Sequence, residues 1–316
     1  MPANHSGIHR ILWNVAKYLL YWFAFRILGR LPMPALYFIA DGVAALSYRV
    51  SPNARAAVMD NVRHAIPDAS ERKRTKVAKQ IFRNATYYYA ELAHVPYVDG
   101  KQFLERVKVT GIPEHLAPSL ATGKGAVLLS AHYGNPEVAM QVMLPLGIHI
   151  FAVTEPVEPP ALSRLMNGVR SSKGIEFKPV GLPSVKRIVQ TVRGGHCVAL
   201  MGDRDIAGPR MRLPFLGEET WMPTGPIEVA IRNDVPVFPT FSMRRGKGRF
   251  EGVVEPPLTI ERTGDLEADT LAAMLQYIER LEARLRSEPD QWAVLERIWD
   301  APAEADERPK ADTVAA

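Results

Sequence analysis

The feature that most constrains the fold of this chain is an alternation of short β-rich runs and helical stretches that begins after Gly111. Six apolar runs are predicted strands: 126–130, 149–154, 176–180, 197–201, 235–241 and 250–254. Predicted helices lie at 136–144, 160–172, 184–193 and 226–233, and a longer amphipathic one at 266–286. Strands that alternate with helices form sheets with crossover connections. We therefore predict an α/β fold with a mixed sheet flanked by helices.

The first hundred residues differ and are predicted to be almost entirely helical, with helices at 11–28, 35–48, around 58–62 and at 71–89. The first of these is apolar and aromatic, but Lys17 and Arg26 make it a poor membrane span. Its polar residues at 10, 14, 17 and 21 share one helical face, and tryptophan and tyrosine favour a bilayer interface. We interpret it as an interfacial helix; a helix packed on the core is the alternative.

Three regions follow from this pattern. Residues 1–100 are expected to be a hydrophobic helical region that associates with a membrane, and residues 101–300 an α/β catalytic domain. Residues 301–316 are acidic and rich in alanine, which is typical of a disordered tail.

Charge and cysteine content narrow the function classes. The net charge of +5 suits an anionic partner such as a phospholipid surface. Nucleic acid is disfavoured, because the chain lacks RNA-binding and zinc-finger signatures. The single cysteine, Cys197, lies in an apolar run and is expected to be a buried hydrophobic residue rather than a nucleophile. No histidine spacing suggests a metal site.

His132 is the first candidate for catalysis. It follows the strand predicted at 126–130 and precedes a helix that is expected to begin at Pro136. Ligands of open α/β sheets bind at the carboxyl ends of strands. Glu137 lies in the first turn of the helix, where the helix dipole favours a carboxylate. An imidazole with an acid partner takes a proton from an attacking hydroxyl. The alternative is a core histidine beside a capping glutamate.

The surroundings of His132 resemble a known family. Residues 123–137, which end in the pattern H-x4-E, are similar to the H-x4-D/E block of the lipid A biosynthesis lauroyl/myristoyl acyltransferases. That family belongs to the lysophospholipid acyltransferase-like superfamily and includes phosphatidylinositol mannoside acyltransferases. Further blocks match in order between about residues 10 and 300: 61–67, 82–84, 167–170 with Gly174, 202–205, 213–217, 222–226, and 289–292 with Trp299. An ordered series is more specific than one motif.

The resemblance implies direct transfer of a fatty acyl group from an acyl thioester, on acyl-CoA or acyl carrier protein, to a hydroxyl of a glycolipid or phospholipid. His132 would be the general base, and no permanently bound cofactor would be needed. Asp203 takes the place of the acid that contacts the histidine in the mannoside acyltransferases, so it competes with Glu137. It would reach the same sheet edge if the strands at 126–130 and 197–201 were neighbours. The expected location is the cytoplasmic face of the bacterial inner membrane.

Four further residues are predicted to bind substrate: Arg170, Arg204, Asn135 and Asp205. A guanidinium can bind a phosphate or a developing oxyanion, and a salt bridge from Asp205 to Arg204 is the structural alternative. The basic cluster at 244–249 surrounds two glycines and is expected to be a solvated hairpin tip.

Two rival functions stay open. Pro136 replaces a tryptophan that many mannoside-type relatives carry, so the acceptor can also be a simple lysophospholipid. A noncatalytic membrane-binding relative is the second alternative. A hydrolase is disfavoured, because the chain has no G-x-S-x-G elbow.

Overall fold

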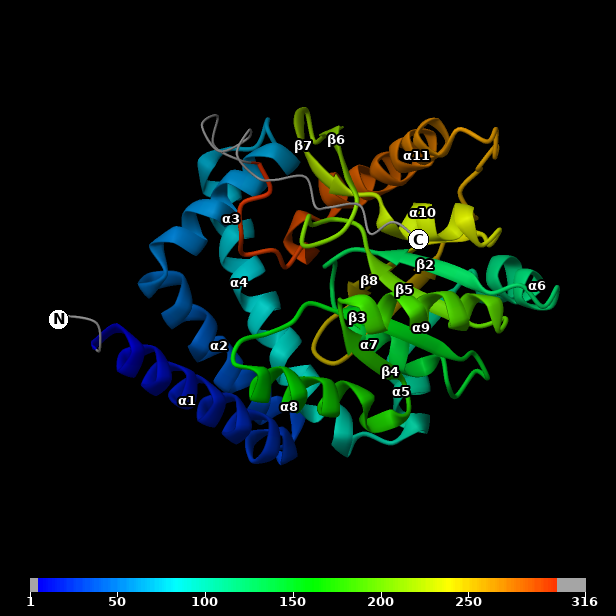
Figure 1. The fold of residues 1–316 in the computed structure, drawn as a ribbon. Coiled ribbons are helices and arrows are strands. Elements are labelled where there is room, and N and C mark those ends of the chain that lie inside the picture. Colours follow the sequence, from blue (N-terminus) through cyan, green and yellow to red (C-terminus); the bar gives the residue numbers. More distant parts are fainter. Residues whose placement is uncertain (1–4, 300–316) are drawn as a thin grey trace.

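The computed structural model describes residues 5–299 and is built around a seven-stranded mixed sheet (Figure 1). The strand order is β1-β9-β8-β2-β5-β3-β4. The strands are β1 Val107–Thr110, β2 Ala126–Ser130, β3 Ile150–Thr154, β4 Glu176–Pro179, β5 Cys197–Met201, β8 Val237–Arg244 and β9 Phe250–Val254. In this sheet β8 and β9 pair antiparallel, whereas the other neighbours are parallel. The predicted mixed α/β fold is confirmed; the tail predicted at 301–316 lies outside the described residues.

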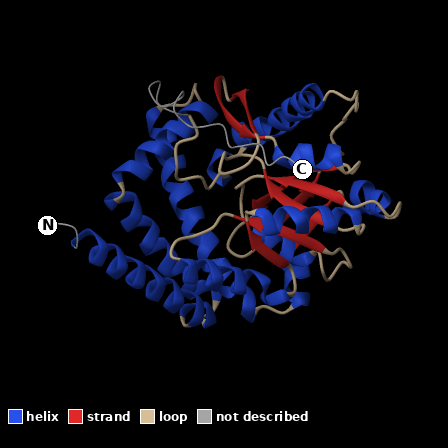
Figure 2. Cartoon of the chain, in the orientation of Figure 1, coloured by secondary structure: helices blue, strands red, loops and turns tan. Residues whose placement is uncertain are grey.

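Helices cover the sheet and form a layer beside it (Figure 2). They are α1 His5–Arg26, α2 Met33–Val50, α3 Pro52–Ala65, α4 Glu71–His94, α5 Gly100–Arg106, α6 Ala117–Leu120, α7 Pro136–Ala139, α8 Pro160–Arg170, α9 Leu182–Arg193, α10 Gly225–Arg232 and α11 Leu266–Ser287. Side-chain caps fix several starts: Ser70 accepts from the backbone N–H of Lys73 before α4, and Asp265 caps α11. The predicted N-terminal helices are present. No helix within residues 5–299 combines the length and apolarity needed to cross a bilayer.

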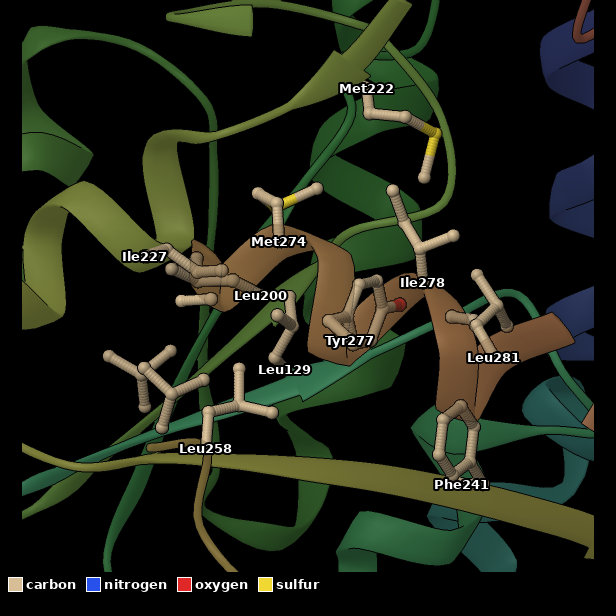
Figure 3. Close-up of a cluster of buried hydrophobic side chains, with 14 of the residues drawn as sticks. Leu129, Leu200, Met222, Ile227, Phe241, Leu258, Met274, Tyr277, Ile278 and Leu281 are labelled. Atoms are coloured by element: carbon tan, nitrogen blue, oxygen red, sulfur yellow. The ribbon is translucent and has the colours of Figure 1, made fainter. Parts of the chain in front are cut away.

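Both faces of the sheet are buried. In β2, Val127 and Leu129 belong to one apolar cluster, and Ala126 and Leu128 belong to another on the opposite face. This explains the uninterrupted apolar run, because a central parallel strand has no solvent face. On the first face, α11 inserts Met274, Tyr277, Ile278 and Leu281 against the sheet, as Figure 3 shows. Tyr277 also donates a hydrogen bond to the carbonyl of Ser130 at 2.8 Å, so it ties α11 to the end of β2.

Three strands were not predicted from the sequence. β1 has four residues, and the hairpin of β6 Arg210–Phe215 and β7 Glu218–Pro223 forms a separate two-stranded sheet. The hairpin strands carry arginine and glutamate on their exposed positions and have no continuous apolar run. The helix predicted at 136–144 is shorter, because α7 passes into a 3-10 turn at Met140–Val142.

Candidate active site

Sheet register brings His132 and Asp203 together. β2 and β5 are parallel neighbours, and their last residues, Ser130 and Met201, are partners. His132 and Asp203 each lie two residues beyond these partners, so both leave the sheet at the same edge. Nδ1 of His132 lies 2.9 Å from Oδ1 of Asp203. The expectation that the two strands are neighbours is confirmed.

Asp203 is fully buried and accepts three hydrogen bonds. Oδ1 bonds the His132 ring, while Oδ2 accepts from the backbone N–H of His132 at 3.0 Å and from Nε1 of Trp292 at 2.9 Å. Burial raises the pKa of Asp203, but the charge of His132 and these hydrogen bonds outweigh it, so its pKa lies below the usual range. An ionised carboxylate only accepts, so Nδ1 of His132 carries the proton.

The other ring nitrogen of His132 is available. Within residues 5–299, no protein group forms a hydrogen bond with Nε2, and the imidazole is 26% exposed. With the proton on Nδ1, Nε2 has a free lone pair that points away from Asp203. This is the arrangement that a general base requires.

The turn after His132 is fixed by β8. Gly134 has a φ of +68°, and a Cβ there would lie 1.9 Å from the carbonyl oxygen of Ser242. The hydroxyl of Ser242 donates to the carbonyl of Tyr133 at 2.8 Å and accepts from the N–H of Asn135 at 3.1 Å. Only glycine combines this φ with such a close approach.

Asn135 is buried and holds the turn through its side chain. Its side chain caps α7 by accepting from the N–H of Val138, and its Nδ2 donates to Glu91 at 2.8 Å. The residue has no exposed surface, so its predicted contact with substrate has no structural support and stays a prediction.

Glu137 lies against Arg170 rather than against His132. Its Oε2 accepts from Nε of Arg170 at 2.7 Å, and both side chains are only 9% exposed. Burial lowers the pKa of Arg170, but the charge of Glu137 outweighs it and the net pKa is raised. Tyr88 lies partly buried beside the pair, and desolvation followed by the charge of Glu137 raises the pKa of its hydroxyl. Of the two acids that compete for His132, the structure places Asp203 on the imidazole.

Arg204 and Asp205 follow Asp203 in sequence, and their side chains are more exposed than that of Asp203. Arg204 is 15% exposed and pairs with Glu155 at 3.4 Å and Glu296 at 2.5 Å. Asp205 is 13% exposed and pairs with Arg210 at 2.6 Å. The salt bridge from Asp205 to Arg204 that we considered as an alternative is therefore not formed.

One expectation about the basic cluster is wrong. Arg244 is not solvated: it is buried in β8 and pairs with the buried Glu91. Its guanidinium also lies over the rings of Tyr87 and Phe250. Desolvation lowers the pKa of Arg244 to about 10. Hairpin composition predicted a polar tip, but it did not show that β8 extends as far as Arg244.

The segment around Trp292 lies beside His132, a position that was not predicted from the sequence. The N–H of Gly134 donates to the carbonyl of Gln291 at 2.7 Å, and the N–H of Ala293 donates to the carbonyl of His132 at 2.9 Å. Tyr133 and Trp292 thus form an isolated antiparallel bridge. The segment belongs to a block that resembles the family, but the sequence did not indicate that it borders His132.

Comparisons with known proteins show to which family the chain belongs. The family model described as bacterial lipid A biosynthesis acyltransferase matches residues 8–301. A phosphatidylinositol mannoside acyltransferase of Mycobacterium tuberculosis is 28% identical over 216 residues, which are 67% of this chain and 66% of that protein. A protein of the same name from Mycolicibacterium smegmatis is 28% identical over 229 residues, 72% of this chain and 73% of the relative. The match thus spans just under two thirds of the M. tuberculosis protein.

Proposed function

The chain belongs to the bacterial lipid A biosynthesis acyltransferase family, and on this premise we propose that it moves a fatty acyl group from an acyl thioester to a hydroxyl of a glycolipid. The observation that carries the proposal is the His132–Asp203 pair, with Nδ1 bound to a buried carboxylate and Nε2 open. A hydroxyl that approaches Nε2 meets a base whose tautomer and orientation are fixed.

The reaction follows from this pair. Nε2 of His132 takes the proton of the acceptor hydroxyl while its oxygen attacks the thioester carbonyl. The ionised Asp203 stabilises the imidazolium that forms. The tetrahedral intermediate then collapses, the carbon–sulfur bond breaks, and the thiolate leaves with the proton that the imidazolium returns. The products are an ester of the acceptor and a free thiol, and the enzyme ends in its starting state.

The substrates are proposed by class. The relatives reported above are named phosphatidylinositol mannoside acyltransferases and the family is named for lipid A biosynthesis, so we propose a glycolipid of one of these types as the acceptor. Acyl-CoA and acyl carrier protein both supply the thioester. Among the predicted substrate contacts, Arg204 and Asp205 are the best placed, because their side chains are 15% and 13% exposed whereas Arg170 and Asn135 are buried.

We also propose that the protein works on the cytoplasmic face of the bacterial inner membrane. The face of α1 that points toward the protein is partly polar, with Asn14, Lys17 and Tyr21 half-buried. Its outward face is apolar, and α2 exposes apolar side chains as well. On the two helices 11 side chains are 41–79% exposed, namely Ile11, Leu12, Trp13, Val15, Leu19, Leu20, Trp22, Phe23, Phe38, Val43 and Leu46. A helix that packed its apolar face on the core would show the opposite pattern.

Lipid mass spectrometry tests the proposed function. In cells that lack the protein, we expect one acylated lipid to disappear and its deacyl precursor to accumulate. The wild-type chain restores the lipid, whereas His132→Ala does not. His149→Ala is the matched control, because His149 is exposed and precedes β3 at the opposite edge of the sheet. An unchanged lipid profile would overturn the proposed function, and activity of His132→Ala would overturn the proposed base.

A further inference from the structure

The indole of Trp292 is the one side-chain donor, apart from His132, that contacts Asp203 among the described residues. Its Nε1–H donates to Oδ2 at 2.9 Å, while Oδ1 accepts from the His132 ring. Trp292 is 2% exposed and Asp203 has no exposed surface, so water does not compete for the bond. Oδ1 thus binds the imidazole, while Oδ2 binds the indole and the backbone N–H of His132.

The indole is itself rigidly placed. Its backbone neighbours, Gln291 and Ala293, bond the residues on either side of Tyr133, so His132 and Trp292 lie on one short ladder. Its ring packs edge-on against Phe215 at 5.8 Å and against Trp299 at 6.5 Å. A displacement of the indole would therefore break backbone hydrogen bonds as well as aromatic contacts.

We propose that Trp292 is a positioning residue: its N–H prevents the Asp203 carboxylate from rotating and thereby keeps the His132 imidazole aimed at the acceptor hydroxyl. The inference rests on the proposed function. Without the indole, Oδ2 is held by the backbone N–H of His132 alone, so the carboxylate can turn further about its χ2 bond and bind the imidazole in more than one geometry. Groups that orient a reacting side chain in this way commonly change activity by about 10- to 100-fold.

Trp292→Phe removes the donor and keeps an aromatic ring. Trp299→Phe is the matched control, because Trp299 is 4% exposed, belongs to the same aromatic cluster and donates to the backbone carbonyl of Glu218 rather than to Asp203. We expect kcat of Trp292→Phe to fall about 10-fold or more with KM nearly unchanged, and kcat of Trp299→Phe to stay within about twofold of wild type.

The pH profile separates positioning from packing. Without the indole donor, the Asp203 carboxylate attracts protons more strongly. The His132–Asp203 pair therefore keeps its second proton to higher pH. The acid limb of the kcat profile should move upward by about 0.5 pH unit or more in Trp292→Phe and not in Trp299→Phe. A wild-type profile in Trp292→Phe, or equal shifts in both variants, would overturn the proposal.

Nuclear magnetic resonance tests the same bond without an activity assay. The chain has five tryptophans, so five indole N–H signals are expected. Asp203→Asn should shift one of them, whereas Asp234→Asn, at an exposed aspartate that pairs with Lys124, should shift none of them comparably. If no indole signal responds to Asp203→Asn, the proposal fails even where Trp292→Phe is too unstable to assay. If the signal responds but the wild-type protein acylates no lipid, the proposed function is wrong, whereas the hydrogen bond from Trp292 to Asp203 is still supported.

Discussion

At the scale of single residues, the site is decided by which acid contacts His132. Glu137 is five residues away in sequence, yet it pairs with Arg170 at 2.7 Å. Asp203 is 71 residues away and contacts the imidazole at 2.9 Å. The register of β2 and β5 therefore outweighs nearness along the chain. The two acids have different surroundings, and this makes their roles separable by substitution.

Replacing Asp203 by Asn should abolish most of the activity. The amide has nearly the shape of the carboxylate, but it donates where Nδ1–H needs an acceptor, and it cannot stabilise an imidazolium. We expect kcat to fall by about 10³-fold or more, with KM changed by less than about threefold. Steady-state kinetics of acyl transfer measure both values.

Asp234→Asn is the control for that substitution, because Asp234 is exposed, pairs with Lys124 and precedes β8 at the opposite edge of the sheet. If Asp203→Asn retained more than about a tenth of the wild-type kcat, Asp203 would not be the acid that serves His132. A large loss in Glu137→Gln together with a mild one in Asp203→Asn would return that role to Glu137.

At the scale of elements, a buried network joins the N-terminal helices to the turn after His132. Glu91 of α4 accepts from Tyr37 of α2 at 2.7 Å and from Asn135 at 2.8 Å, and it pairs with Arg244 of β8. The backbone N–H of Arg244 donates to Gln291 at 2.8 Å, beside Trp292. One carboxylate therefore connects two helices, the sheet and the turn after His132.

Glu91→Gln should be strongly destabilising, because it leaves the Arg244 guanidinium buried without a counter-charge. Breaking a buried pair in this way costs about 3–5 kcal/mol, which urea unfolding measures. Glu219→Gln is the matched control, since Glu219 and Arg212 form an exposed pair and such pairs contribute about 0–1 kcal/mol. Equal effects of the two substitutions would show that the Glu91 network does not stabilise the fold.

The proposed membrane contact also depends on whole elements, namely on the apolar faces of α1 and α2. We expect Leu19→Glu with Leu46→Glu to lower binding to anionic lipid vesicles by about tenfold or more, because each leucine buried in lipid contributes about 1.5–3 kcal/mol. Both leucines are more than half exposed. Vesicle co-sedimentation measures the bound fraction.

The control for vesicle binding is Leu271→Glu with Leu275→Glu. These leucines are also exposed, but they lie on α11, across the molecule from α1 (Figure 1). Retained binding in the variant of α1 and α2, or an equal loss in both variants, would contradict docking through α1 and α2.

At the scale of the whole molecule, the sequence predicted the central strands best. β2, β5 and β9 were placed to the residue, because each is a short apolar run that ends at glycine, proline or polar residues. β6 and β7 were missed, since they pair mainly with each other and alternate apolar with charged residues. The division into an N-terminal region, a catalytic domain and a tail stays a prediction.

The site was predictable only in part, for the same reason. His132 and Asp203 were recognisable because each follows an apolar strand. Their contact depends on the strand order, which no local pattern encodes. The burial of Asn135 and Arg244 and the bond of Trp292 to Asp203 depend on segments that lie 44 or more residues apart in sequence.

Cys197 offers a test of how the whole molecule unfolds. It lies in β5, which is flanked by β2 and β3, and burial raises the pKa of its thiol to about 12. Because it is the only cysteine, a thiol reagent labels the chain at one place. Helices and sheet are joined through Glu91, so we expect β5 to open only when the whole fold does. The free energy of opening from labelling rates at pH 8 should then equal the free energy of unfolding from urea.

A second variant is the control for the labelling experiment. Cys197→Ala with Ser172→Cys carries its thiol on an exposed turn after α8 and should react at the rate of a free peptide. If Cys197 labelled with an opening free energy several kcal/mol below the urea value, and with a weak dependence on urea, the sheet would open separately from the N-terminal helices. Agreement of the two free energies instead means that unfolding of the N-terminal helices and loss of the His132–Asp203 pair occur in one transition, because two of the strands that bury Cys197, β2 and β5, place both of these side chains.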